Sequence, residues 1–146
     1  MITGVSFVGV AVNDIEEAQK QYAEVFGIEP WDHGIVEMPG VKAVMFSLRG
    51  CSIELLQPTV GPEAPAGGDL ARWMARQGEG LCRLGLWVDN LDEEIKRLKE
   101  RGLQIIESGV YRETGEEIGA KMAFVHPRST SGVLIELDQQ IQERAV

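Results

Sequence analysis

The chain has 146 residues, of which 44% are hydrophobic and 25% are charged, and its formal net charge is −9. This length and composition are typical of a soluble protein with one domain, or with two small modules that share a core. Nucleic acids and anionic membranes attract basic surfaces, and the sequence has no run of Lys or Arg. We therefore expect neither kind of partner.

Targeting segments and metal-binding cysteines are not indicated. The first residues lack the basic region and the small-residue cleavage site of a signal peptide, and no apolar run approaches the ~18 residues of a membrane span. The two cysteines, Cys51 and Cys82, have no metal-ligand spacing. We expect a cytoplasmic protein with reduced, buried thiols, and a disulfide between them is the less favoured alternative.

The same order of elements occurs twice in the chain. Residues 7–28, FVGVAVNDIEEAQKQYAEVFGI, align with residues 83–103, RLGLWVDNLDEEIKRLKERGL. Each copy begins with an alternating strand. Asp14 and Asn90 then stand at the expected N-caps of amphipathic helices, and Gly27 and Gly102 stand where such helices end. The pattern predicts one strand and one helix in each copy.

Further strand-like segments follow each helix. AVMFSLRGCSIELLQP in the first half resembles KMAFVHPRSTSGVLIELDQ in the second, with Met45-Phe46 aligned to Ala123-Phe124. Each half therefore predicts a βαβββ module, the first over about residues 3–58 and the second over about 81–140. Residues 59–80 predict a Pro/Gly-rich linker and a short helix from Asp69 to Gln77, N-capped by Asp69. Because neither half buries much core alone, we expect a single α+β domain over 1–146.

Arg83 lies in the middle of an apolar strand. Strand alternation places Cys82, Leu84, Leu86 and Val88 on one face and Arg83, Gly85 and Trp87 on the other. An unpaired buried charge is very unfavourable, so Arg83 needs water or a carboxylate partner. By the same alternation, Phe7, Glu54 and Glu136 lie on the concave face of each predicted curved sheet.

The paired modules, with their IELLQP and HPRSTSGVLIEL endings, resemble the vicinal oxygen chelate superfamily. That superfamily includes glyoxalases, extradiol dioxygenases, bleomycin-resistance proteins and methylmalonyl-CoA epimerase. The stretches GEGLCRLGLWVDNL, KMAFVHP and STSGVLIEL resemble the epimerase most. The resemblance covers nearly the whole chain and implies two curved sheets around a cleft, and a homodimer.

In metal-using members of the superfamily, two histidines and two Glu or Gln residues hold a divalent metal. Carried over by the resemblance, these four positions fall on Phe7, Arg83, Glu54 and Glu136. Both imidazoles are therefore replaced, one of them by a permanent cation that would repel a metal. Two carboxylates alone make a poor site for zinc, cobalt or nickel, so we expect no metal and no other cofactor.

We therefore expect Arg83 to supply the positive charge that a metal supplies in relatives, with Glu54 or Glu136 as a general base. The resemblance also implies an acid near VEMPG, for which Glu37 is a candidate. The expected activity is metal-independent proton transfer, isomerisation or a related lyase step on a small carbonyl, carboxylate or acyl-thioester compound. The alternative is a non-catalytic binder of the drug-sequestering type.

Each candidate has a structural alternative. For Arg83 the alternative is an ion pair that joins the two halves without a chemical role, or exposure to solvent. For Glu54 and Glu136 the alternative is that they are remnants of a metal site. Two groups of residues are candidates for substrate binding. Buried aromatic residues more often belong to the core, and basic residues in turns are more often solvated. The candidates are an apolar cup of Phe7, Met45 and Trp87, and a phosphate contact of Lys121, Arg128, Ser129 and Thr130. Residues 111–120 form a candidate lid.

Overall fold

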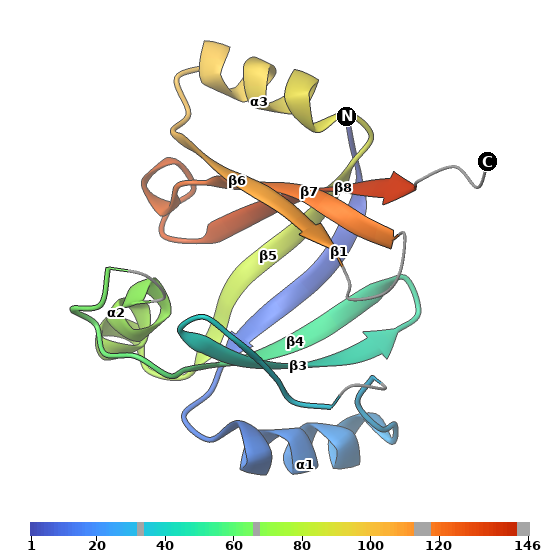
Figure 1. Ribbon diagram of the computed structural model, residues 1–146, viewed down its shortest axis with the longest axis vertical. Coiled ribbons are helices and arrows are strands. Elements are labelled where there is room, and N and C mark those ends of the chain that lie inside the picture. Colours follow the sequence, from blue (N-terminus) through green and yellow to red (C-terminus); the bar gives the residue numbers. More distant parts are fainter. Residues whose placement is uncertain (32–33, 66–67, 113–117, 143–146) are drawn as a thin grey trace. The chain divides into compact units, whose positions relative to one another are not determined.

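The computed structural model describes residues 1–31, 34–65, 68–112 and 118–142. Figure 1 shows the elements in their chain order. They are β1 (Ile2–Ala11), α1 (Ile15–Phe26), β2 (Val36–Met38), β3 (Val41–Leu48), β4 (Cys51–Pro58), α2 (Gly68–Gln77), β5 (Gly80–Val88), α3 (Leu91–Glu100), β6 (Ile105–Arg112), β7 (Ile118–Val125), a 3-10 turn (Pro127–Ser129) and β8 (Leu134–Gln142). The mixed α+β class and the repeated βαβββ order are confirmed.

The chain divides into two compact units. The N-terminal unit comprises Phe7–Cys82, and the C-terminal unit comprises Met1–Ser6 together with Arg83–Val146. Strand order is β2-β3-β4-β1 in the N-terminal unit and β5-β8-β7-β6 in the C-terminal unit. In each unit the first and last strands of the module are parallel, and the remaining pairs are antiparallel. The strand β1 contributes residues to both units.

Helices cover both faces of the sheet in the N-terminal unit. Successive side chains on a strand point to opposite faces, so neighbouring residues such as Leu55 and Leu56 enter different clusters. The cluster with α1 contains Val10, Val12, Ile15, Ala18, Val44, Phe46 and Leu55. The cluster with α2 contains Ala11, Ala43, Leu56 and Cys82, against which Leu70, Trp73 and Met74 pack.

One core cluster lies between α3 and the sheet of the C-terminal unit. It contains Val88, Leu91, Leu98, Ala123, Val125 and Leu137, with Leu86 and Ile95 packed against it. The predicted apolar stripe of α3 is therefore confirmed. Cys82, predicted on the same face as Leu86 and Val88, belongs to the cluster of the N-terminal unit. The reason is that the chain passes from one unit to the other between Cys82 and Arg83.

The ends of α1 and α3 follow the prediction. Asp14 accepts hydrogen bonds from the N–H groups of Glu16 and Glu17, and Asn90 accepts one from Glu93. Gly27 and Gly102 have left-handed φ angles of 66° and 83°, which a residue with a side chain adopts less readily. The predicted cap of α2 is wrong, because the helix begins at Gly68 and Asp69 lies within its first turn, paired with Arg72.

A glutamine of the last strand completes each cap in the same way. Gln57 of β4 accepts a hydrogen bond from the N–H of Ile15 at 2.9 Å, and Gln139 of β8 accepts one from Leu91 at 2.7 Å. The first N–H groups of a helix have no partner within the helix, so these contacts tie each helix to its sheet. The pair also fixes the register of the repeat, with Gln57 equivalent to Gln139.

That register corrects one predicted alignment by a residue. Met45 lies opposite Glu54, and Phe124 lies opposite Glu136, so Met45 is equivalent to Phe124 rather than to Ala123. A shift of one residue on a strand moves every side chain to the other face. Phe124 therefore lies on the face of the glutamates, whereas the predicted alignment assigned it to the helix-covered face.

Both ends of the candidate lid, residues 111–120, are strand. Positions 111–112 end β6 and positions 118–120 begin β7. Residues 113–117 lie outside the described residues. In the part of the chain that the structure describes, no helix has both the length and the apolar character needed to cross a membrane.

The cap of α1 gives a stability prediction. Asp14→Ala removes the acceptor of two backbone N–H groups, and we expect the free energy of unfolding to fall by ~1 kcal/mol. Urea denaturation followed by circular dichroism measures this as a lower midpoint with an unchanged slope. Asp14→Asn retains an acceptor and should lose much less. An equal loss in both variants would contradict the cap assignment.

Candidate functional site

Three strands of the C-terminal unit bring the charged residues together. In the parallel pair of β5 and β8, Arg83 lies beside Leu134 and Gly85 beside Glu136. Glu136 lies opposite Phe124 of β7. Glu136 and Asp138 are two residues apart on one strand, so both side chains point to the same face. This is the face that the α3 cluster does not use, because Leu137 belongs to that cluster.

Arg83 contacts both a carboxylate and an aromatic ring. Its Nη1 donates to Oε2 of Glu136 at 3.4 Å, and its guanidinium carbon lies 5.7 Å from the centre of the Phe124 ring. The Arg83 side chain is 26% exposed and that of Glu136 is 8% exposed. Ion pairs removed from water in this way interact more strongly than surface pairs. The Nε atom of Arg83 is buried and has no hydrogen-bond partner among the described residues.

A second carboxyl group lies next to this pair. Asp138 is 5% exposed and accepts a hydrogen bond of 2.7 Å from the Oγ of Ser6. It is also hydrogen-bonded to Glu136. Burial raises the pKa of Asp138, while its hydrogen bonds to Ser6 and Glu136 and the charge of Arg83 act in the opposite direction.

The predicted residues of the N-terminal unit are placed by its own sheet. Glu54 is half-buried on β4, between Gly9 of β1 and Met45 of β3, which is also half-buried. Phe7 is buried on β1. Glu37 is exposed on β2 and forms an ion pair of 3.7 Å with Lys42. Glu54 and Glu136 thus occupy equivalent positions in their own units.

The remaining candidates lie in the C-terminal unit or outside the described part of the chain. Trp87 is half-buried on β5. Lys121 forms an ion pair of 3.4 Å with Asp92. The hydroxyl groups of the predicted phosphate-binding turn contact local backbone, since Ser129 accepts from Gln104 and Thr130 donates to Val133. His33 lies outside the described residues.

Three residues of this cluster were not predicted as site residues. Phe124 was missed because of the one-residue alignment error. Asp138 was missed although strand alternation already placed it on the face of Glu136. Ser6 had no local signal, since its hydroxyl meets a carboxyl group 132 residues away in the sequence.

The residues at the four metal positions do not fit a divalent ion. Phe7 has no ligating atom, Arg83 is a cation, and Glu136 is already ion-paired with Arg83. His126 accepts a hydrogen bond from the N–H of Arg128 and serves as the cap of a 3-10 turn. Among the described residues, no group of three or more His, Cys, Asp or Glu could hold a metal.

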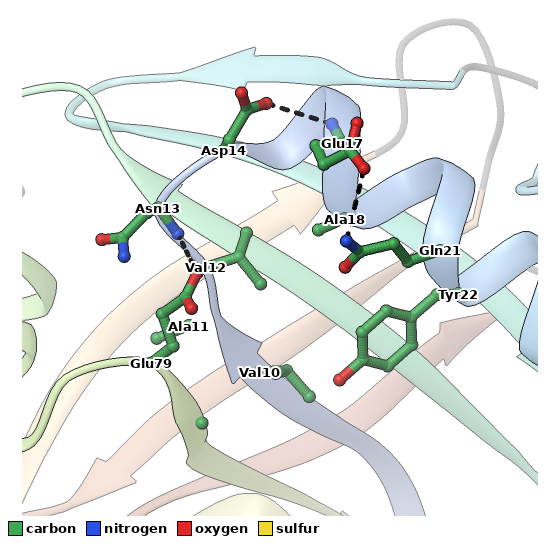
Figure 2. A pocket seen from close by; sticks show the side chains of 11 residues that line it. Val10, Ala11, Val12, Asn13, Asp14, Glu17, Ala18, Gln21, Tyr22 and Glu79 are labelled. Atoms are coloured by element: carbon green, nitrogen blue, oxygen red, sulfur yellow. Dashed lines mark hydrogen bonds between the residues drawn. The ribbon is translucent and has the colours of Figure 1, made fainter.

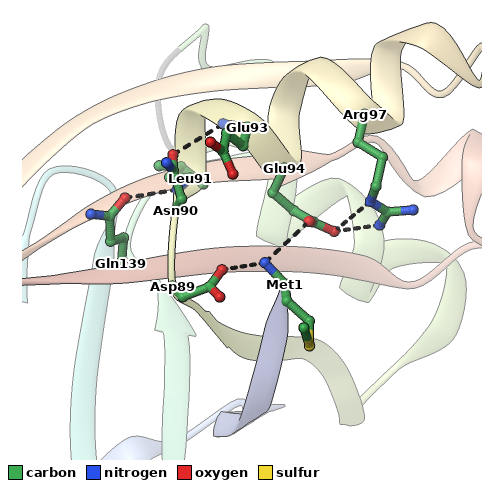
Figure 3. Close-up of polar contacts among 8 residues, drawn as sticks. All are labelled: Met1, Asp89, Asn90, Leu91, Glu93, Glu94, Arg97 and Gln139. Atoms are coloured by element: carbon green, nitrogen blue, oxygen red, sulfur yellow. Dashed lines mark hydrogen bonds and ion pairs between the residues drawn. The ribbon is translucent and has the colours of Figure 1, made fainter.

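Two surface hollows lie away from these strands. One, of about 500 Å³, lies at the start of α1, where the Asp14 and Glu79 side chains accept backbone hydrogen bonds (Figure 2). The other, of about 560 Å³, adjoins Met1, whose ammonium group contacts Asp89 and Glu94 (Figure 3). Neither hollow contains Arg83 or the predicted glutamates. Their polar groups serve helix caps and surface ion pairs.

The sequence matches the family model described as the Glyoxalase/Bleomycin resistance protein/Dioxygenase superfamily over residues 7–124. The chain is 32% identical to a mitochondrial methylmalonyl-CoA epimerase of Bos taurus, over 90% of this chain and 71% of the relative. It is 30% identical to an ethylmalonyl-CoA/methylmalonyl-CoA epimerase of Cereibacter sphaeroides, over 95% and 99% of the two chains.

A solved structure agrees with these relatives. The crystal structure of a selenomethionine-labelled methylmalonyl-CoA epimerase is 31% identical and has a TM-score of 0.72, with 95% of this chain and 96% of that chain covered. The matches extend over both βαβββ modules rather than over one motif. The chain therefore belongs to the Glyoxalase/Bleomycin resistance protein/Dioxygenase superfamily, with methylmalonyl-CoA epimerases among its relatives.

Proposed function

We propose that this chain is a metal-independent acyl-CoA epimerase, which moves a proton at the carbon next to a thioester carbonyl. The relatives named above support the acyl-CoA substrate class and the reaction type. The observation that carries the proposal is the ion pair of Arg83 and Glu136 on one sheet face, at positions where metal-using relatives keep a histidine and a carboxylate.

Arg83 has the chemistry that the reaction needs. Removal of the α-proton leaves an enolate whose oxygen carries negative charge, and a fixed cation stabilises such an oxyanion. The guanidinium has five N–H donors, and its Nη1 donates to Glu136. Its contacts with Glu136 and Phe124 hold the cation in one place before the substrate arrives. We assign Arg83 the role of electrophile.

The two glutamates are not equally suited to act as the base. A neighbouring guanidinium stabilises the ionised carboxylate and makes it a weaker proton acceptor, which argues against Glu136. We therefore propose Glu54 as the general base, with Glu37 as the alternative acid. Phe7, Met45, Trp87 and Lys121 remain proposed substrate contacts.

The partner and location predictions also remain proposals. We expect a homodimer, which size-exclusion chromatography with light scattering measures directly. We expect an acyl-CoA ligand and a cytoplasmic location. A non-catalytic small-molecule binder is the competing function, because both histidine positions are replaced in this chain.

The proton-transfer proposal predicts isotope exchange. Incubated in deuterated water with methylmalonyl-CoA or ethylmalonyl-CoA, the protein should exchange the α-proton at the same rate with and without EDTA. Arg83→Met keeps an unbranched apolar side chain but removes the charge, and should lower the rate by ~100-fold or more. NMR of the thioester α-proton measures the rate.

Control variants separate the roles. Glu54→Gln should abolish exchange, while Lys96→Gln on the exposed face of α3 should leave it unchanged. Binding of the acyl-CoA in calorimetry with no exchange would instead identify a binder. Exchange that EDTA removes and zinc or cobalt restores would refute the metal-independent mechanism.

The buried Asp138 predicts a pH dependence of stability. Because burial raises its pKa above the ordinary value of 3.8, the group favours folding most below that value. Its contribution is lost as the pH rises through the folded-state pKa. Asp138→Asn cannot ionise and does not lose stability in this way. The difference between its melting temperature and that of the parent protein should therefore increase as the pH rises from about 4 to about 7. A constant or decreasing difference would contradict the burial effect.

A further inference from the structure

The two modules differ at one buried pair of side chains. In the register of the repeat, Asp138 is equivalent to Leu56 and Ser6 is equivalent to Cys82. Leu56 and Cys82 belong to the same apolar cluster of the N-terminal unit. At the equivalent place in the C-terminal unit, Ser6 and Asp138 form a buried hydrogen bond of 2.7 Å. One module thus has an apolar pair where the other has a polar pair.

Stability alone does not account for this difference. Burying a carboxyl group is unfavourable unless its partners are well placed, and apolar replacements of similar shape are often neutral or stabilising. The N-terminal unit shows that the repeat accommodates such a pair, with Leu56 1% and Cys82 8% exposed. The polar pair occurs in the unit that contains Arg83, which suggests a role connected with that charge.

The polar pair is joined to Arg83 by continuous contacts. Ser6 donates to Asp138, Asp138 lies two residues from Glu136 on the same face of β8, and Glu136 accepts from Arg83. Both carboxyl groups are buried, at 6% exposure for Glu136 and 5% for Asp138. Neither can therefore turn toward water without losing a partner. The orientation of Glu136 is thereby fixed by Asp138 on one side and Arg83 on the other.

We propose that Asp138, held by Ser6, is a positioning residue that fixes Glu136 and, through it, the direction of the Arg83 guanidinium. The inference rests on the proposed function, because that function assigns to Arg83 the stabilisation of the negative charge that develops on the substrate. Asp138 and Ser6 act through Glu136 and do not contact the substrate.

The chain itself provides the test substitution. The double variant S6C/D138L introduces the apolar pair of the N-terminal unit into the C-terminal unit. We expect a folded protein with an equal or higher melting temperature. We also expect ~100-fold slower α-proton exchange on methylmalonyl-CoA, mainly through kcat, because a misplaced catalytic group loses rate without losing substrate. Exchange at the parental rate in the folded double variant would overturn the proposal.

A conservative variant keeps the proposal testable if S6C/D138L fails to fold. Asp138→Asn can donate to Glu136 and accept from Ser6, so it should retain most of the exchange rate. Asp138→Ala has neither group and should lose it. Equal rates in the Asn and Ala variants would show that the hydrogen bonds have no positioning role.

Two controls separate this proposal from the proposed function and from general destabilisation. Arg97→Met removes one of the ion-pair partners of Glu94, another buried acid of the C-terminal unit, and should lower the melting temperature without changing exchange. If Arg83→Met also exchanges at the parental rate, the proposed function itself is wrong. If Arg83→Met is inactive while S6C/D138L is active, only the positioning role is wrong.

Discussion

The ion pair between Arg83 and Glu136 imposes the strictest physical condition in the C-terminal unit. A guanidinium that is 26% exposed and a carboxylate that is 8% exposed cannot both rely on water, so the surrounding residues must complete their contacts. Phe124 supplies an aromatic face for the cation, and Asp138 is buried beside the anion on the same face of β8. The composition of this sheet face follows from the need to hold one positive charge beside two acids.

In the proposed function, the guanidinium of Arg83 takes the place of a metal ion. A divalent ion needs several donor atoms at once, and Phe7 and Arg83 provide none. A guanidinium brings its own charge and needs only a partner that keeps it in place. Under this proposal, the same sheet and the same glutamate position serve a different source of positive charge.

The repeat gives this interpretation an internal comparison. Both units have the same strand order, the same glutamine contact to the first residue of a helix, and a glutamate at the same place on the last strand. Against this common background, the pair Ser6–Asp138 stands out from its apolar equivalent Cys82–Leu56. The pair Ser6–Asp138, present in only one unit, is therefore a candidate for function.

The sequence by itself determined the repeated βαβββ order, the helices α1 and α3 with their caps, and the face of the strand on which Arg83 lies. These properties depend on residues close together in the chain, such as Asp14 and the N–H groups of the next turn. Only the tertiary structure decided that Phe124 lies under Arg83, because a one-residue choice of strand register selects the face. It also decided that Ser6 meets Asp138 across 132 residues and that Cys82 belongs to the other unit, since such contacts depend on where the chain passes between units.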